Sequence, residues 1–360
     1  MASEKRPIVL HIGDPVKWNK TFYEQFSKDF VVIRPSTEER QRDEFIKALK
    51  EKRWGDFSAI FRPFWNTGGE MGRWDKELIP LLPESCKVFA SAGAGYDWVD
   101  VDILADRGIL YCNSAAASSE SVADFALFLI IATFRNLKWC STASSDPSTF
   151  KHCHEEAAVQ SHNPRGNSLG IIGLGNIGFE IAKKVHFALG MNIKYYDVIR
   201  KSSSQEALVN AEFFANLEDM LGVCDCVVLA TPASPNGKKV IDRERLKRFK
   251  IGSRFVNIAR GSLVDEEAVA DAVDEGRLVG VGLDVHEHEP KVNERLKTMR
   301  QVMLTSHNAG GTLDTHIGFE LFSMKNIDAV LKGKDALTAV NKHLMKNPEI
   351  KKGQNRALLA

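Results

Sequence analysis

An arginine, a glutamate and a histidine occur in order late in the sequence, each after its own short apolar run. Arg260 lies in NIARG, Glu289 in HEHEP and His307 in SHNAG. Reduction of a carbonyl group needs a hydride donor, a proton donor and a cation that holds a neighbouring carboxylate. An imidazole titrates near neutrality, so His307 is the candidate proton donor. Glu289 could hold one tautomer of that ring and raise its pKa, and Arg260 could grip a carboxylate in a two-pronged contact.

A glycine-rich segment is the expected binding site for the hydride donor, a dinucleotide cofactor. Gly173-Leu174-Gly175-Asn176-Ile177-Gly178 is a GxGxxG sequence between a strand-like run (169–172) and a helical pattern (179–189). In this motif the first glycine permits a tight turn, the second lets the backbone approach a pyrophosphate, and the third allows close packing of helix on strand. The pyrophosphate would lie at the helix N-terminus, where unpaired N–H groups favour negative charge.

The choice between NAD and NADP depends on the end of the next strand. Asp197, 19 residues beyond Gly178, would accept hydrogen bonds from the ribose hydroxyls and repel a 2′-phosphate. Arg200 and Lys201 follow closely and could soften this preference. NAD is therefore the expected cofactor and NADP the less favoured one.

The elements that must position these groups follow an alternating pattern. Short apolar runs alternate with amphipathic segments almost from end to end, which is typical of parallel sheets with crossover helices. One set of strand-like runs covers 7–13, 30–34, 57–62, 86–91 and 109–113, with a helix over 36–52. A second set of six, suited to a doubly wound sheet, covers 168–172, 191–196, 225–230, 254–258, 280–285 and 301–305.

The segments between and after these sets are less regular. We expect a long helix over 119–139, with Ser118 and Ser119 as candidate N-caps, followed by an irregular connection over 141–165. A final helix is expected over 312–331, and the Lys-rich tail from Lys332 is expected to be loosely held.

Length and composition indicate a soluble globular chain of about two domains. Its 360 residues suit about two domains, and 44% hydrophobic with 26% charged residues is a globular profile. With 48 basic and 47 acidic residues, no overall basic field favours nucleic acid or an anionic membrane. Six cysteines without a CxxC pair indicate free thiols in a reducing compartment. The longest apolar run, 125–134, is short for a membrane span, and the N-terminus lacks a secretory stretch. A cytoplasmic location is expected.

Taken together, the GxGxxG segment, NxARG, DVxxxEP and the histidine before a small-residue turn resemble the NAD-dependent D-2-hydroxyacid dehydrogenases, over about residues 7–332. The segments AGAGYDW (92–98), NPRG (163–166) and GDP (13–15) are most similar to fungal-type D-mandelate dehydrogenases within that family. The resemblance implies that Arg260 orients the substrate, that Glu289 is the partner of the histidine, and that His307 is the acid/base. It further implies substrate-carboxylate binding by the backbone of Gly93, Ala94 and Gly95, and cofactor contacts from Thr231, Pro232, Ala259 and Asp284. Asp284 would contact the nicotinamide amide; a purely structural turn residue is the alternative.

The resemblance also implies a fold and an assembly. A Rossmann-type doubly wound cofactor domain (114–309) would be inserted into a smaller flavodoxin-like α/β substrate domain (1–113 and 310–332), with 333–360 as a C-terminal tail. The active site would lie in a cleft that closes as the domains hinge. The helix over 119–139 resembles the arm that builds the family's homodimer. The loop 233–238 departs from the usual threonine-rich pattern, which bears on the cofactor contacts there.

The segment FRPFW (61–65) follows a strand yet places aromatic residues in a loop. It is either ordinary core or an apolar wall, including Phe64 and Trp65, for a bulky side chain such as a phenyl ring. The favoured function is therefore interconversion of a bulky 2-oxo acid and its D-2-hydroxy acid, of the phenylglyoxylate and D-mandelate kind. A glyoxylate or hydroxypyruvate reductase and, in a different class, an NAD(H)-binding corepressor-like scaffold remain open.

Two clusters resemble metal ligands. In HEHE (286–289) the two histidines would share one face of an extended segment, but no third ligand is implied, and zinc sites usually need three. HCHEE (152–156) lies in the expected irregular connection and suits a surface loop. We expect no metal. Cys224 and Cys226 flank Asp225 at a strand start and are expected to be buried, inert thiols.

Overall fold

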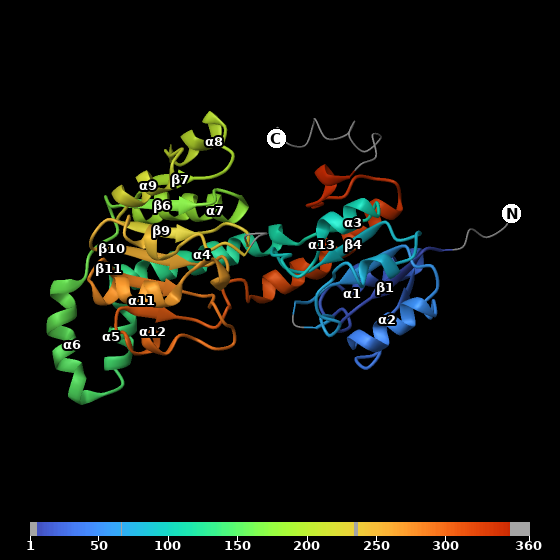
Figure 1. Cartoon of the computed structure of the whole chain (residues 1–360), viewed down its shortest axis with the longest axis horizontal. Helices are drawn as coiled ribbons and strands as arrows, with labels where there is room; N and C mark the ends of the chain where they lie inside the picture. The colour runs from blue at the N-terminus through green and yellow to red at the C-terminus, as the bar shows by residue number, and fades with distance from the viewer. Residues whose placement is uncertain (1–5, 66, 234–236, 346–360) are drawn as a thin grey trace. The chain divides into compact units, whose positions relative to one another are not determined.

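The computed structural model describes residues 6–345 except 66 and 234–236, and the chain divides into two compact units (Figure 1). Unit 1 comprises Met1–Ser118 and Thr312–Ala360, and unit 2 comprises Ser119–Gly311. Each unit is built on its own parallel sheet. Both sheets carry the alternation of strands and helices that the sequence pattern predicts, so the α/β fold class is confirmed.

Unit 1 contains a five-stranded sheet in the order β2-β1-β3-β4-β5, with every neighbouring pair parallel. This is the flavodoxin-like order, as expected. Every strand lies inside its predicted run. The strands are β1 (Ile8–His11), β2 (Val31–Ile33), β3 (Ala59–Arg62), β4 (Val88–Ser91) and β5 (Leu110–Cys112).

Helices cover both faces of this sheet. On one face, α13 packs on β3 and β4 and buries Met324 and Ile327 against Phe26 of α1. On the other face, Phe45 of α2 joins Trp74 and a second apolar cluster. The helical segments are α1 (Lys20–Asp29), α2 (Arg42–Lys50), η1 (Ile79–Leu81), α3 (Val101–Asp106), α13 (Leu313–Leu331) and η4 (Lys342–Leu344).

The segment after α13 is held in place, contrary to the expectation of a loosely held tail, which is wrong for residues 333–345. The side chain of Asn341 is fully buried; it accepts a hydrogen bond from the backbone N–H of Tyr111 (2.8 Å) and donates to the carbonyls of Val101 and Ile109 (both 3.0 Å). Val340 adds a backbone hydrogen bond to Tyr111 (2.9 Å). The segment thereby satisfies backbone groups at the edge of β5, which its lysine-rich composition does not reveal. Residues 346–360 lie outside the described residues.

Unit 2 contains a seven-stranded parallel sheet in the order β12-β11-β10-β9-β6-β7-β8. All six predicted strands are present. The seventh, β8, is only two residues long and gives no pattern to detect. The strands are β6 (Ser168–Ile172), β7 (Asn192–Tyr196), β8 (Glu212–Phe213), β9 (Cys226–Leu229), β10 (Ser253–Asn257), β11 (Leu278–Leu283) and β12 (Val302–Leu304). The chain order reverses between β6 and β9, so this is a doubly wound sheet of the Rossmann type with its switch point there.

The helices of unit 2 flank this sheet. They are α4 (Ala115–Phe134, which begins in unit 1), α5 (Leu137–Ala143), α6 (Pro147–Gln160), α7 (Asn176–Lys184) with the π-turn η2 (Val185–Leu189), α8 (Ser203–Leu208), α9 (Leu217–Val223), α10 (Arg243–Leu246), η3 (Gly261–Leu263), α11 (Glu266–Asp274) and α12 (Glu294–Thr298). Helix α4 is long and apolar enough to cross a membrane by length and composition alone. Its Leu129, Ile130 and Phe134 are fully buried in the core of unit 2, so the core explains these apolar residues.

The expected single helix over 119–139 and the irregular connection after it are both corrected. The helix begins at Ala115, so Ser118 lies in its first turn and donates its hydroxyl to the carbonyl of Ala115 instead of capping (3.3 Å). The chain breaks at Asn136, whose φ of 50° is left-handed, a conformation that asparagine tolerates. Helix α6 then begins at Pro147, where Asp146 accepts from the N–H of Ser148. Figure 1 shows α5 and α6 as a helical hairpin.

Candidate active site

Unit 2 places the three candidate catalytic residues after three neighbouring strands. Arg260 follows β10, Glu289 follows β11 and His307 follows β12, and these strands lie side by side in the sheet. Carboxyl ends of parallel strands share one edge, which is where open α/β sheets bind their ligands. Nδ1 of His307 lies 2.9 Å from Oε2 of Glu289. The predicted pairing of these two side chains is thus present.

The charge of Glu289 suits the role of a partner for the imidazole. Burial raises the pKa of its carboxyl, but the hydrogen bond from His307 and the backbone N–H of His286 outweigh burial and hold the pKa below the usual 4.5. An ionised carboxylate accepts from Nδ1–H, which fixes the tautomer and leaves Nε2 for a reacting group. Glu289 and His307 are both partly exposed, so a small molecule can reach the pair.

Asp284 builds the turn that presents His307. Its carboxylate is buried and accepts from the backbone N–H groups of Asn308 and Ala309 (both 2.9 Å) and from the hydroxyl of Thr305 (2.7 Å). Its carbonyl accepts from the N–H of His307 (2.7 Å), whose φ of 52° is left-handed and therefore strained. Asp284 thus acts first as a structural turn residue, and its predicted contact with the cofactor amide stays a prediction.

Asn257 and Gly261 fix the segment that carries Arg260. The side chain of Asn257 is buried; it donates to the carbonyl of Arg260 and accepts from the N–H of Ala259 (both 3.0 Å). A Cβ on Gly261 would lie 1.9 Å from the carbonyl carbon and oxygen of His286. Only glycine lets these two backbone segments touch, so the NIARG segment and the HEHEP segment are packed as one piece.

The glycine motif has the geometry that a pyrophosphate site requires. Gly173 has φ of 94°, and a Cβ on Gly178 would lie 2.1 Å from the carbonyl oxygen of Gly173. Gly175 precedes α7, and a Cβ there would meet nothing within 4 Å. The strand, the turn and the helix are therefore those predicted, with open space beside the second glycine at the helix N-terminus. Asn176 and Ile177 form the first turn of α7.

Asp197 lies directly after β7 and faces the glycine turn. Its Oδ2 accepts from the N–H of Leu174 (2.9 Å), and the ammonium of Lys201 lies 3.4 Å away. Arg200 instead pairs with Glu206 (2.9 Å). Of the two cations that could soften the preference for NAD, Lys201 is thus the one beside the carboxylate.

The remaining predicted cofactor residues also follow strands of this sheet. Thr231 and Pro232 come after β9, beside the glycine turn, since a Cβ on Gly173 would lie 3.1 Å from Cα of Thr231. Ala259 comes after β10. In the loop 233–238, residues 234–236 lie outside the described residues.

In unit 1, the segment Gly93–Gly95 follows β4 and offers its amides. The carbonyl of Gly93 accepts from the N–H of Ser114, and that of Ala94 accepts from the side chain of Asn113 (both 2.9 Å). Among the described residues, no oxygen accepts from the N–H groups of residues 93–95. Unpaired amides in a turn are suited to bind an anion such as a carboxylate.

An aromatic cluster in unit 1 includes the predicted wall residues. We use this name for Trp18, Phe64, Trp65, His316 and Phe319. The ring of His316 lies 5.3 Å from Trp65, 5.6 Å from Trp18 and 6.0 Å from Phe319, measured between centroids. Phe64 is buried and Trp65 half-buried, so FRPFW is partly core, and its role as a wall for a substrate side chain stays a prediction. The sequence analysis missed Trp18 and His316, because they lie 298 residues apart in the chain and only the fold brings them together.

Arg62 is a further residue that the sequence analysis passed over. Its guanidinium donates to the carbonyls of Trp65 (2.8 Å) and Gly68 (3.0 Å) and lies 4.6 Å from the ring centre of Trp98. In the described part of unit 1, no carboxylate lies within ion-pair distance of it. Burial lowers the pKa of Arg62. The buried guanidinium of Arg62 thus holds the loop that contains Phe64 and Trp65. In the sequence, the position of Arg62 at the end of a predicted strand could have marked it as a candidate.

The clusters that resembled metal ligands have other structures. His286 is buried and His288 exposed, so they do not share a face. Residues 152–156 lie on α6, where Cys153 is buried, so the expected surface loop is wrong. Within the described ranges no group of three or more His, Cys, Asp or Glu side chains is placed to hold a metal ion. Cys224 and Cys226 are buried, and burial raises the pKa of both thiols to about 12, which keeps them protonated and unreactive.

Comparison with known proteins identifies the family of this chain. Residues 127–309 match the family model described as D-isomer specific 2-hydroxyacid dehydrogenase, NAD binding domain. The chain belongs to the D-isomer-specific 2-hydroxyacid dehydrogenase family. Among solved structures, D-mandelate dehydrogenase from Rhodotorula graminis in its holo form is 40% identical, with a TM-score of 0.89 and coverage of 94% of this chain and 98% of that chain.

Two curated relatives show the range of substrates within the family. The 4-methyl-2-oxopentanoate reductase A of Aspergillus oryzae is 32% identical over 91% of this chain and 96% of its own length. A glyoxylate reductase of Thermococcus kodakarensis is 35% identical over 76% of this chain and 82% of its own length. The predicted family, the enzyme class and the NAD-binding domain are thereby confirmed. This 2-hydroxyacid dehydrogenase is an oxidoreductase, and its substrate is a 2-hydroxy acid or the corresponding 2-oxo acid.

Proposed function

We propose that the chain interconverts a bulky 2-oxo acid and its D-2-hydroxy acid, of the phenylglyoxylate and D-mandelate kind, with Arg260, Glu289 and His307 as the catalytic residues. The observation that carries this proposal is the 2.9 Å pairing of His307 with Glu289 beside the strand that leads to Arg260. When NAD(H) is bound, its nicotinamide ring supplies or accepts the hydride.

The chain's own residues supply the other steps. His307 donates a proton from Nε2 to the carbonyl oxygen during reduction and takes it back during oxidation. Glu289, ionised, stabilises the imidazolium that exists before the transfer. Arg260 holds the substrate carboxylate and polarises the adjacent carbonyl. In unit 1, the proposed substrate-binding groups are the backbone amides of Gly93, Ala94 and Gly95. Gly173, Gly175, Gly178 and Asp197 hold the cofactor, with Asn176, Ile177, Thr231, Pro232, Ala259 and Asp284 contributing.

The histidine is tested by His307→Gln, which keeps a polar side chain but cannot transfer a proton. We expect turnover to fall about 10²–10⁴-fold while NADH still binds. His288→Gln, which changes an exposed histidine that the proposed mechanism does not use, is the control. NADH binding is measured by fluorescence and turnover by NADH absorbance. Equal turnover in the two variants would remove His307 from the mechanism.

The aromatic cluster favours the proposal of a bulky substrate, and Phe64 and Trp65 are the predicted contacts of the substrate side chain. A glyoxylate or hydroxypyruvate reductase is the second candidate, favoured by the glyoxylate reductase among the relatives. Trp65→Ala separates them. If the aromatic cluster binds the side chain, this change lowers kcat/KM for phenylglyoxylate about 10-fold and leaves glyoxylate, which has no side chain, unchanged. A wild-type enzyme that prefers glyoxylate, or equal effects on both substrates, would favour the second candidate. Tight NADH binding with negligible turnover of every 2-oxo acid tried would favour a scaffold role.

We also propose a cytoplasmic homodimer. Helix α4 leaves Phe128 38% exposed although the helix is strongly apolar, and the ring of Phe128 packs on Phe125 (5.7 Å between centroids). A second copy of the chain would cover this face. Phe128→Glu should convert the dimer to monomer in light scattering after size exclusion, and an unchanged mass would argue against this interface.

A further inference from the structure

His286 is buried where three segments meet, and each segment carries one of the proposed catalytic residues. It is 5% exposed, it lies in the loop after β11, and the proposed mechanism does not use it. Its ring, its backbone N–H and its backbone carbonyl each contact a different neighbour. These contacts join the residue to the segments of His307, Glu289 and Arg260.

The ring of His286 contacts the segment of His307. Its Nε2 lies 2.8 Å from the carbonyl oxygen of Thr305, two residues before His307. A carbonyl only accepts, so Nε2 carries the proton of this hydrogen bond. The bond therefore joins the loop after β11 to the end of β12.

The backbone of His286 contacts the other two segments. Its N–H donates to Oε1 of Glu289 (2.9 Å), while Oε2 of the same carboxylate faces His307 (2.9 Å). Its carbonyl group lies against Gly261, next to Arg260, at a distance that leaves no room for a Cβ. A shift of His286 would thus displace Glu289 and the arginine segment together.

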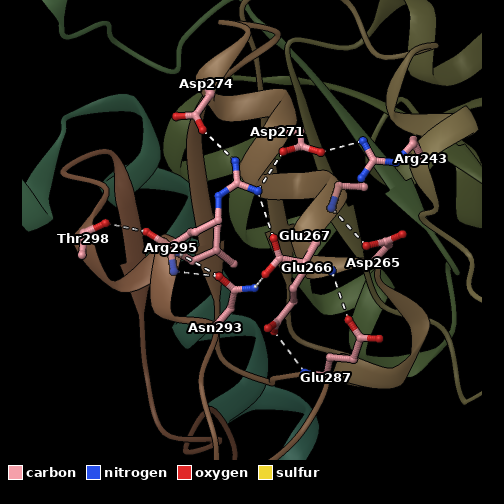
Figure 2. Close-up of polar contacts among 12 residues, drawn as sticks. Arg243, Asp265, Glu266, Glu267, Asp271, Asp274, Glu287, Asn293, Arg295 and Thr298 are labelled. Carbon is pink, nitrogen blue, oxygen red and sulfur yellow. Dashed lines mark hydrogen bonds and ion pairs between the residues drawn. The ribbon is translucent and has the colours of Figure 1, made fainter.

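Glu266 holds His286 from the opposite side. This carboxylate, at the start of α11, is 4% exposed, and its Oε1 lies 3.5 Å from Nδ1 of His286. The two groups are within ion-pair distance, and Nδ1 has no hydrogen-bond partner among the described residues. Figure 2 shows the reciprocal hydrogen bonds between Glu266 and Glu287, from the N–H of Glu287 to Oε1 (3.0 Å) and from the N–H of Glu266 to Oε2 of Glu287 (3.2 Å). The loop is thereby fastened to α11 at the residue directly after His286.

The charge of the ring agrees with this geometry. Burial lowers the pKa of His286, but the carboxylate of Glu266 and the carbonyl of Thr305 outweigh burial and raise the pKa above its usual 6.5. Glu289 adds to this effect, and the other carboxylate of the loop, Glu287, is engaged by Lys239 (2.5 Å). Both ring nitrogens thus face oxygen atoms, which orients the ring in one direction.

We propose that His286 is a positioning residue for catalysis, which through Thr305 and Glu289 keeps the carboxylate of Glu289 at hydrogen-bond distance from His307 and the arginine segment in register. This proposal rests on the proposed function, because it acts through the proposed catalytic residues. The proposal also explains the HEHEP sequence without a metal: the first histidine is buried and hydrogen-bonds to Thr305, and the second faces solvent.

The test compares two uncharged replacements with a matched control. His286→Phe keeps the ring shape but cannot donate to Thr305, whereas the amide nitrogen of His286→Gln lies near the position of Nε2 and can. His288→Phe, on the same loop but 79% exposed, is the control. We expect His286→Phe to lower kcat about 10–100-fold, with KM for NADH within about 2-fold of wild type, and His286→Gln to recover most of kcat. The kcat is calculated per NADH-binding site, so that unfolded protein does not lower it.

The outcomes that overturn the proposal are distinct from those that overturn the function. Equal kcat in His286→Phe and His288→Phe, or equal losses in the Phe and Gln variants, overturns the positioning role. Should His286→Phe not fold, His286→Asn replaces it, because its shorter amide cannot reach Thr305; equal kcat in the Asn and Gln variants then overturns the role. His307→Gln is measured in parallel. If it keeps full turnover, the proposed function and this inference fall together; if it is inactive while His286→Phe is normal, only this inference falls.

Discussion

Replacement of Gly261 by alanine tests whether the segments that carry the proposed catalytic residues are packed as one piece. The new Cβ would lie 1.9 Å from the carbonyl carbon and oxygen of His286 and 2.5 Å from the N–H nitrogen of Glu287, whereas ordinary contacts begin at 3.4 Å. The neighbouring loop must therefore retreat by about 1.5 Å, since both colliding partners are backbone and cannot rotate away. Gly261 does not have a positive φ, so alanine meets no conformational barrier and the effect is steric.

The expected loss of kcat follows from the distance between Glu289 and His307. Glu289 lies three residues beyond His286 and meets His307 at 2.9 Å, so a displacement of about 1.5 Å takes the carboxylate out of hydrogen-bond range. A misplacement of about 1 Å in an active site costs about 10²-fold in rate, and we expect at least that loss of kcat in Gly261→Ala. Backbone crowding of this kind also costs about 1–3 kcal/mol of stability.

The assay is steady-state reduction of a 2-oxo acid, with NADH binding measured separately by fluorescence. We expect kcat to fall and NADH affinity to stay near wild type, because the glycine turn of residues 173–178 is not touched. Gly222→Ala is the matched control, since outside its own helix the new Cβ would meet its nearest neighbour among the described residues, the carbonyl oxygen of Arg248, only at 3.8 Å. A kcat in Gly261→Ala equal to that of the control would refute the reasoning.

Two further predictions concern the stability of unit 1. Burial lowers the pKa of His11 from 6.5 to about 3, so below pH 6.5 the unfolded chain binds a proton that the folded chain does not, and stability falls as the pH falls towards 3. Between pH 7 and pH 5 this loss is about 2 kcal/mol, and denaturant titrations of wild type and His11→Gln should differ in pH dependence by that amount; parallel curves would contradict it. Asn341→Ala leaves three buried backbone groups without their partner and should cost about 3 kcal/mol or more, seen as a lower Tm; an unchanged Tm would show that the segment after α13 is not held as described.

The strands and the chemical groups were largely predictable from sequence, because both depend on local signals. Every predicted strand is present, since buried parallel strands are short apolar runs. The three catalytic candidates were found because each follows such a run. The errors also have local causes: β8 is too short to give a pattern, and the break at Asn136 and the capped start of α6 at Asp146 are turn features inside a segment without clear periodicity.

Other parts of the site depend on contacts between distant residues. The sequence of the HEHEP segment indicates two histidines on one face, yet the fold buries His286 and exposes His288. Asp284 was assigned to the cofactor by resemblance, and the structure gives it the His307 turn as well. The aromatic cluster unites residues from both ends of the chain.

By itself, the sequence determined the two parallel sheets, the glycine turn, and the identity of the arginine, glutamate and histidine, because strand patterns, the conformational freedom of glycine and side-chain chemistry are properties of short segments. Only the tertiary structure decided which groups hold these residues in place. The Glu289–His307 distance, the burial of His286 against Thr305 and Glu266, and the docking of Asn341 on β5 arise from the packing of segments far apart in the chain, and no local pattern encodes such contacts.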